Sequence, residues 1–207
     1  MADSKKKKGQ NANGIKVLII GLVLICLVAG YYYYLSNKSK RQKAMEETPA
    51  KATAVEEALS YNFERNYPPT PKEVVKLYCQ MTQCFYNEEY TEEEFVQLAL
   101  QVRKLYDDEL IASKTENQYI EDLRWDVNQL RDQEIVISSY ATSASTDVEE
   151  YTKGGFKWAK LYCSFTLRKG TYVDSTNEVF LLRKDDAGHW KIYGFKLADD
   201  EETRAYQ

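Results

Sequence analysis

The sequence is poor in the residues and motifs that build most catalytic and metal sites. It has one histidine and four cysteines in 207 residues, and no two cysteines have the Cys-x-x-Cys spacing that is typical of zinc sites. It contains no phosphate-binding loop, no dinucleotide-binding fingerprint, no serine-nucleophile elbow and no paired-carboxylate motif. The sequence therefore predicts no metal site, no cofactor and no catalytic residue.

Basic residues are scarce outside the N-terminal segment. The whole chain has a net charge of −4. Residues 1–43 hold nine Lys or Arg and one acid, a net charge of +8, so the remainder carries −12. Affinity for nucleic acids comes largely from Lys and Arg contacts with phosphates. We therefore expect no nucleic-acid partner for this acidic body.

One long apolar run is present. It begins at Val17, ends at Leu35, and reads VLIIGLVLICLVAGYYYYL, nineteen residues without a charge. As a helix these residues would reach about 28 Å, close to the hydrocarbon thickness of a bilayer. The four tyrosines near its end suit the headgroup level. Because the apolar part of a signal peptide is only about 7 to 15 residues long, the run predicts an uncleaved transmembrane helix.

Basic residues flank this run on both sides, five before it and four soon after it. Moving the lysine cluster at residues 5–8 across the bilayer is costly, whereas a long C-terminal domain crosses largely regardless of its charge. We therefore expect a single-pass protein of the cell membrane. Residues 1–16 would form a basic cytoplasmic tail, and everything after residue 35 would lie outside, with the lipid bilayer as the partner of residues 17–35.

The rest of the chain divides into a linker, one domain and a tail. Residues 36–66 are first basic and then polar and end before two prolines, which stop any helix. A short helix in this linker would have a thin apolar face made of Val55, Ala58, Leu59 and Phe63. The sequence predicts a domain over residues 67–198 and a polar tail over residues 199–207.

Three helices are expected at the start of the domain. Thr70 and Pro71 are an N-cap and a first helical residue, respectively. Thr91 precedes three glutamates, which form a capping box and suit the positive end of the helix dipole. A third helix is expected from Tyr119 to Arg131. Its apolar stripe comprises Ile120, Leu123, Val127 and Leu130.

After residue 132 the apolar period changes from helical to alternating. Strands are expected at residues 134–140, 159–167, 179–183 and 189–195, with turns at 169–170, 174–177 and 185–188. In the second strand, alternation places Ala159, Leu161, Cys163, Phe165 and Leu167 on one face. Hairpin-length connections without crossover helices predict an α+β fold, in which three helices pack on a curved antiparallel sheet.

The last two strands carry a resemblance to a known family. Residues 179–195 read VFLLRKDDAGHWKIYGF, an apolar strand, an acidic turn with glycine, and then Trp-Lys-Ile and a Gly-aromatic pair. Together with the preceding helices, this pattern resembles the nuclear transport factor 2-like superfamily, also called SnoaL-like, over residues 68–197. The first two helices, residues 70–110, are also similar to those of uncharacterised membrane-anchored proteins of Clostridia-type bacteria.

The resemblance implies a cone-like fold whose sheet and helices enclose a pocket. Some members use it for isomerisation or dehydration, and others only for binding or assembly. Enzymes of the superfamily need an Asp or His base in the pocket, but His189 falls in the last turn, where a solvated residue is expected. The possible pocket-lining residues are Asp126, Trp158, Tyr162 and Tyr193. A surface carboxylate and core aromatic rings are the plainer alternatives for these four.

Two further questions stay open at this point. Cys79 and Cys84 would point about 140° apart on one helix, so they cannot bond to each other, but either could reach Cys163. The function is either that of a membrane-anchored extracytoplasmic binding or assembly module without catalytic activity, or that of an anchored isomerase or dehydratase-like pocket enzyme. The first would bind a protein partner or a small apolar ligand, and the second a small apolar substrate.

Overall fold

The computed structural model describes residues 52–199. The predicted basic tail, the transmembrane helix and residues 200–207 lie outside these residues. Within residues 52–199, no helix combines the length and the apolar character that a membrane span requires. The elements are α2 (Ala54–Leu59), α3 (Pro71–Asn87), α4 (Glu92–Arg103), α5 (Asp108–Ala112), α6 (Glu116–Arg131), β1 (Val136–Thr142), the 3-10 turn Ser145–Asp147, β2 (Glu149–Lys153), β3 (Phe156–Lys169), β4 (Tyr172–Lys184) and β5 (Trp190–Leu197).

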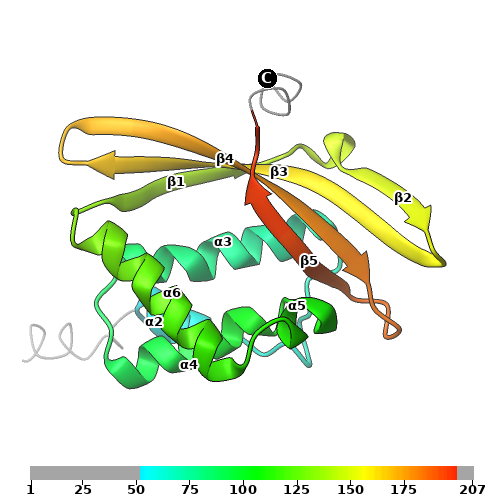
Figure 1. Ribbon diagram of the computed structural model, residues 1–207, viewed down its shortest axis with the longest axis horizontal. Coiled ribbons are helices and arrows are strands. Elements are labelled where there is room, and N and C mark those ends of the chain that lie inside the picture. The colour runs from blue at the N-terminus through cyan, green and yellow to red at the C-terminus, as the bar shows by residue number, and fades with distance from the viewer. Residues whose placement is uncertain (1–51, 200–207) are drawn as a thin grey trace, which may run out of the picture. The chain divides into compact units, whose positions relative to one another are not determined.

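The fold is α+β, with helices gathered on one face of an antiparallel sheet (Figure 1). The strand order is β1-β3-β4-β5, and β2 also pairs with β3. Residues 163–168 of β3 pair with β1 and residues 156–160 pair with β2, while β4 pairs with residues 158–169 along the opposite edge. The predicted α+β class and antiparallel sheet are therefore confirmed.

Local capping chemistry sets where the helices begin. The Thr70 side chain accepts a hydrogen bond from the Glu73 N–H at 3.2 Å, and Pro71 is the first helical residue of α3. Thr91 and Glu94 form the predicted capping box of α4. The third helix, α6, begins at Glu116, three residues before the predicted start, because Thr115 forms a capping box of its own. All three helices thus exist where the sequence predicts them.

The core lies between the sheet and α3. Ala159, Leu161, Cys163 and Phe165 are buried on β3, which confirms the predicted alternation. They continue into buried residues of β4 and β5, and α3 packs against β1, β3 and β5. Burying each large apolar side chain contributes about 1.5 to 3 kcal/mol. The same alternation leaves the opposite face of β3 to side chains that take no part in this layer.

Residues from the expected linker belong to the core. Val55 and Ala58 of α2 are buried in the same cluster as the helices and the sheet. The Gln101 side chain of α4 donates a hydrogen bond to the Leu59 carbonyl at 2.7 Å and another to the Tyr61 carbonyl at 3.2 Å. The thin apolar face of α2 is enough to join this helix to the core because α4 covers it. The core therefore begins before Tyr67.

The sheet differs from the sequence prediction in two places. The predicted turn at residues 174–177 is wrong, because β4 runs straight through it, with Asp174 opposite Leu167 and Asn177 opposite Ser164. Pairing with the long strand β3 outweighs the turn preference of these polar residues. Two elements are not predicted from the sequence, the short helix α5 and the strand β2, whose residues are all exposed.

Candidate functional site

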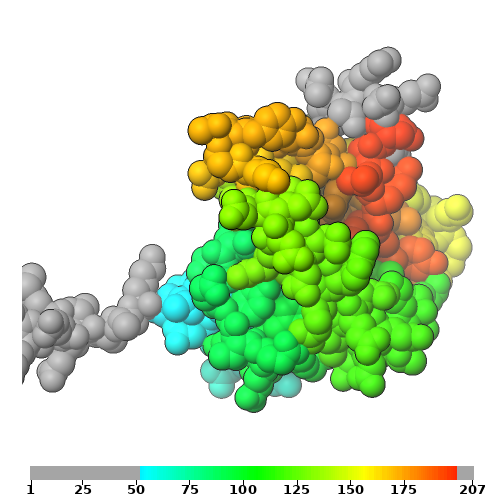
Figure 2. Space-filling model, turned by 60° about the vertical axis from the view of Figure 1, so that its left-hand side comes forward, coloured from blue at the N-terminus to red at the C-terminus, as the bar shows by residue number. Residues whose placement is uncertain are grey.

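A cavity of about 780 Å³ lies between the sheet and the helices. Its walls come from α3, α6, the residues around α5, and the ends of β1, β3, β4 and β5. Figure 2 shows the side of the molecule on which α6 borders β5 and the hairpin between β3 and β4. Segments far apart in the sequence therefore build one pocket, which helix and strand periodicity alone does not reveal.

Eight aromatic side chains line the pocket. Tyr78 of α3 lies 5.5 Å from Phe195 and 6.3 Å from Tyr106, and Tyr106 lies 5.9 Å from Tyr119, all between ring centroids. Burial raises the pKa of Tyr78 and Tyr106 well above the usual value, with a further contribution from Glu178 at Tyr78 and from neighbouring tyrosines at Tyr106. Burial also raises the pKa of Tyr119 to about 12. These hydroxyls stay protonated at physiological pH and present both ring faces and polar tips.

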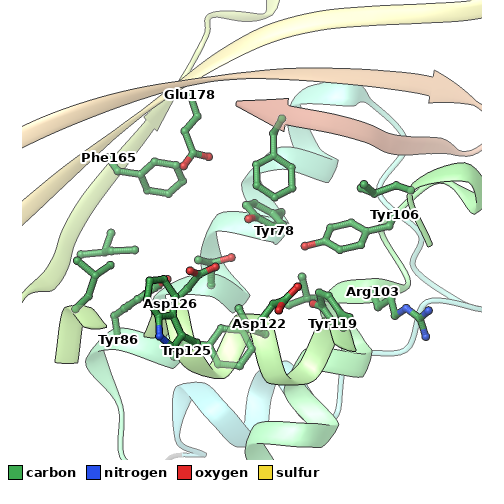
Figure 3. A pocket seen from close by; sticks show the side chains of 18 of the residues that line it. Tyr78, Tyr86, Arg103, Tyr106, Tyr119, Asp122, Trp125, Asp126, Phe165 and Glu178 are labelled. Atoms are coloured by element: carbon green, nitrogen blue, oxygen red, sulfur yellow. The ribbon is translucent and has the colours of Figure 1, made fainter. Parts of the chain in front are cut away.

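Glu178 is the main polar group on the sheet side of the pocket. It lies opposite Cys163 in the β3–β4 pairing, on the face that carries the core. Figure 3 shows its carboxyl group pointing from β4 into the pocket. Burial raises the pKa of Glu178 to about 7. Near neutral pH the group is therefore present both as a carboxylate and as a carboxylic acid, so it can give or take a proton.

Asp126 of α6 lines the same pocket. Figure 3 places it on the helix wall, across from the sheet that carries Glu178. Burial, followed by the charges of Asp126 and Glu178, raises the pKa of Tyr86 to about 12. Of the four residues that the sequence proposed for a pocket, Asp126 is the one that the structure places there.

The mouth of the pocket is apolar and open to solvent. Trp125 of α6 is 65% exposed, Leu197 of β5 is 66% exposed and Phe195 is 41% exposed, and all three line the cavity. Large apolar side chains that are this exposed indicate a binding surface where they gather around a cavity. They place the entrance between α6 and β5.

Trp158 and Tyr193, two of the other proposed residues, lie together in a different place. Their rings are 4.9 Å apart, and the Arg183 guanidinium lies 5.6 Å from the first ring and 5.0 Å from the second. Arg183 also forms two hydrogen bonds to Asp107, at 2.6 and 3.0 Å, and one to Glu109 at 2.7 Å. We call these five residues the Arg183 cluster. None of them lines the pocket.

Tyr162 and His189 also lie outside the pocket. Tyr162 is buried on β3, where its backbone N–H and carbonyl bond to the Ser143 side chain at 2.9 and 3.2 Å. His189 lies in the last hairpin as predicted, with its side chain 45% exposed and its ring 4.3 Å from that of Tyr67. Neither residue is placed to act on a molecule in the pocket.

The cysteines give a clear geometric preference. The Sγ atoms of Cys79 and Cys163 lie 3.4 Å apart, and both residues are free thiols. The Cys84 thiol instead donates to the Gln80 carbonyl at 3.5 Å. Cys79 is therefore the neighbour of Cys163. Within residues 52–199, no three His, Cys, Asp or Glu side chains gather as a metal site would require.

Glu178 is the residue that sequence reasoning missed. It lies between the turn predicted at residues 174–177 and the strand predicted at residues 179–183, and belongs to neither. One signal was present: residues 176, 178, 180 and 182 share a strand face, and Phe180 and Leu182 are apolar. Extending that strand backwards would have placed Glu178 on the core face.

Two comparisons complete the description of the chain. A search of curated proteins gave no match. The profile of one family, described as a domain of unknown function (DUF6715), matches residues 1–195. The match covers the pocket residues as far as Phe195 and extends over the predicted membrane anchor. The chain therefore belongs to the DUF6715 family.

Proposed function

We propose that this protein is a membrane-anchored, extracytoplasmic module that binds a small, largely apolar molecule. Residues 17–35 would hold it in the cell membrane, with the N-terminus in the cytoplasm and the domain outside. The observation that carries the binding role is the cavity of about 780 Å³, whose walls combine aromatic and aliphatic side chains with several polar and charged groups. Natural ligand pockets have volumes of roughly 300 to 1,000 Å³ and this kind of lining. Helices over one face of an antiparallel sheet support the nuclear transport factor 2-like interpretation.

A pair of neighbouring substitutions tests the binding role. Thr176 lines the pocket, whereas Ser175, the adjacent residue of β4, is exposed on the other face. Full-length wild type, Thr176→Trp and Ser175→Trp are purified, and small molecules extracted from each are identified by mass spectrometry. We expect a bound molecule in the wild type and in Ser175→Trp and its loss from Thr176→Trp, because the indole fills the cavity. Equal retention by all three folded proteins would contradict a ligand in this pocket.

The anchor and its orientation need a separate test. We expect the full-length chain to stay with membranes during carbonate extraction, and a chain lacking residues 1–43 to appear in the soluble fraction. Protease added to intact cells, after removal of any outer wall, should digest the domain. Digestion only after lysis would contradict the proposed orientation, and release of the full-length chain by carbonate would contradict the anchor.

A pocket enzyme of the isomerase or dehydratase kind is the second candidate, and Glu178 favours it. A carboxyl group with a pKa near 7 in an apolar pocket is suited to proton transfer at neutral pH. The molecule extracted from the wild type is returned to the protein in D2O. Under this alternative, deuterium enters the molecule with the wild type and not with Glu178→Gln. No exchange with either protein would leave the pocket a binding site only.

A further inference from the structure

The positive charges of the pocket already have partners. Arg103 and Lys114 both line the cavity. The Arg103 guanidinium lies 3.1 Å from the Glu116 carboxylate, and Figure 3 shows it pointing away from the middle of the pocket. The Lys114 ammonium pairs with the Asp122 carboxylate at 2.5 Å. The charge of each cation is therefore already offset by a neighbouring carboxylate.

Two carboxylates that line the pocket are in the opposite situation, Glu178, which is half-buried, and Asp126, which is exposed to solvent. Among residues 52–199, neither Glu178 nor Asp126 forms an ion pair or a hydrogen bond through its carboxyl group. The two groups approach the same space from opposite walls, one from β4 and one from α6 (Figure 3). Burial acts alone in raising the pKa of Glu178, which means that no neighbour compensates its charge. A half-buried carboxylate in this state is stabilised by a cation that enters the pocket.

The aromatic walls suit the same kind of ligand. The negative face of a phenol or indole ring attracts a cation within about 6 Å, and the attraction grows when water is excluded. Tyr78, Tyr106 and Tyr119 line the interior and Trp125 lines the mouth. These rings also cover the apolar body of a ligand at low entropic cost. The ring faces and the two carboxylates without a cationic partner therefore both favour a positively charged ligand.

We propose that the ligand of this pocket is an organic amine, a molecule with an apolar body and an ammonium group. The inference rests on the proposed binding function. The ammonium group would lie between Glu178 and Asp126, and the apolar body would lie among the tyrosines and extend toward Trp125 and Leu197. Carboxylic acids of the same shape are repelled by both carboxylates, and neutral alcohols gain from the rings alone.

The test uses three probes with the same body and different head groups, 4-phenylbutylamine, 4-phenylbutanol and 4-phenylbutyrate. Their binding to the full-length chain in phosphatidylcholine nanodiscs is measured by calorimetry at pH 7, with empty nanodiscs as the blank. We expect the amine to bind at least about tenfold more tightly than the alcohol, and the butyrate to bind most weakly. The double variant Glu178→Gln, Asp126→Asn should lose about tenfold or more in amine affinity and keep its affinity for the alcohol.

The control variant is Glu150→Gln, which removes an exposed glutamate from β2, outside the pocket. It should bind the amine as the wild type does. Equal affinities for the three probes, tightest binding of the butyrate, no binding of the amine, or the same amine affinity in the double variant overturns the inference. If the alcohol still binds and Thr176→Trp blocks it, the pocket remains a binding site and only the amine specificity is wrong. If no probe binds and no molecule is extracted from the protein, the binding function fails as well.

Discussion

The Arg183 cluster and the pocket both combine aromatic and charged side chains, but the charges are paired in the cluster, whereas two carboxylates of the pocket have no cationic partner within residues 52–199. In the Arg183 cluster, one guanidinium lies among aromatic rings and bonds to both Asp107 and Glu109. In the pocket, Glu178 and Asp126 lie among aromatic rings without a cationic partner within residues 52–199. The first arrangement is complete in itself, and the second leaves both space and charge for another molecule. Aromatic and charged side chains on a sheet therefore indicate a site only where something is left unsatisfied.

The largest loss of stability is expected from removing the Asp107 carboxylate from the Arg183 cluster. The side chains of Arg183 and Asp107 are only 14% and 4% exposed. Asp107→Ala removes two hydrogen bonds, leaves the guanidinium without its main partner and deletes the N-cap of α5. We expect a loss of about 3 to 5 kcal/mol in the free energy of unfolding. Urea unfolding of the full-length chain measures it, and a loss below about 1 kcal/mol would show that the cluster is not structural.

The free energy of unfolding should fall as the pH rises, because Glu178 ionises in the pocket. A carboxylate held in a stabilising ion pair has the opposite effect. The pKa of Glu178 rises from 4.5 to about 7 on folding, so the folded chain binds more protons than the unfolded chain between these values. The wild type therefore loses stability as the pH rises through this range. Glu178→Gln cannot ionise and should be roughly 3 kcal/mol more stable than the wild type at pH 8 and about equal at pH 4. Urea unfolding at the two pH values measures the difference, and a less stable variant at pH 8 would mean that a cation compensates the carboxylate.

A smaller change in the Arg183 cluster separates charge from shape. Arg183→Lys keeps the positive charge but cannot form the paired hydrogen bonds to Asp107 or stack its plane on Trp158 and Tyr193. We expect a loss of about 1 to 2 kcal/mol in stability and an unchanged affinity for the pocket probe. Full retention of stability would show that charge alone matters at this position. A change in probe affinity would link the cluster to the pocket.

The smallest effect on stability is expected at the mouth of the pocket. Trp125 is 65% exposed, and alanine is a better helix former, so Trp125→Ala should change stability by less than about 0.5 kcal/mol. Its affinity for 4-phenylbutylamine should nevertheless fall about three- to tenfold, because a ring face is lost. The matched control is Tyr172→Ala, which removes another exposed aromatic residue outside the pocket. An equal effect of both variants on binding would remove Trp125 from the site.

Local chemistry made the helices predictable, and distant pairing made the site unpredictable. The caps at Thr70 and Thr91 act within a few residues, so they can be read directly from the sequence. The strand through Asp174 exists because β3 pairs with it, and that pairing depends on residues close in space only after folding. Glu178 follows the same rule, since its place in the pocket depends on the register of β4 against β3.

The proposed pocket residues show the same limit. Asp126 was placed from helix periodicity, which fixes the face of a residue within its own element. Trp158 and Tyr193 were expected in a pocket as aromatic residues of the sheet, but their place in a strand does not reveal their partners beyond the sheet. Arg183, Asp107 and Glu109 come from two other parts of the chain and complete that arrangement. The nuclear transport factor 2-like assignment and the membrane anchor stay predictions.

Strand β4 is paired on both sides over one half of its length and on one side over the other half. Residues 178–183 of β4 pair with strands on both sides, whereas residues 172–176 pair with β3 alone. Amide hydrogens in the middle of β3 should therefore exchange with solvent most slowly, and those of residues 172–176 much earlier. Because Thr176 belongs to this less protected end, part of the sheet wall of the pocket should exchange its amide hydrogens while the rest of the sheet stays protected.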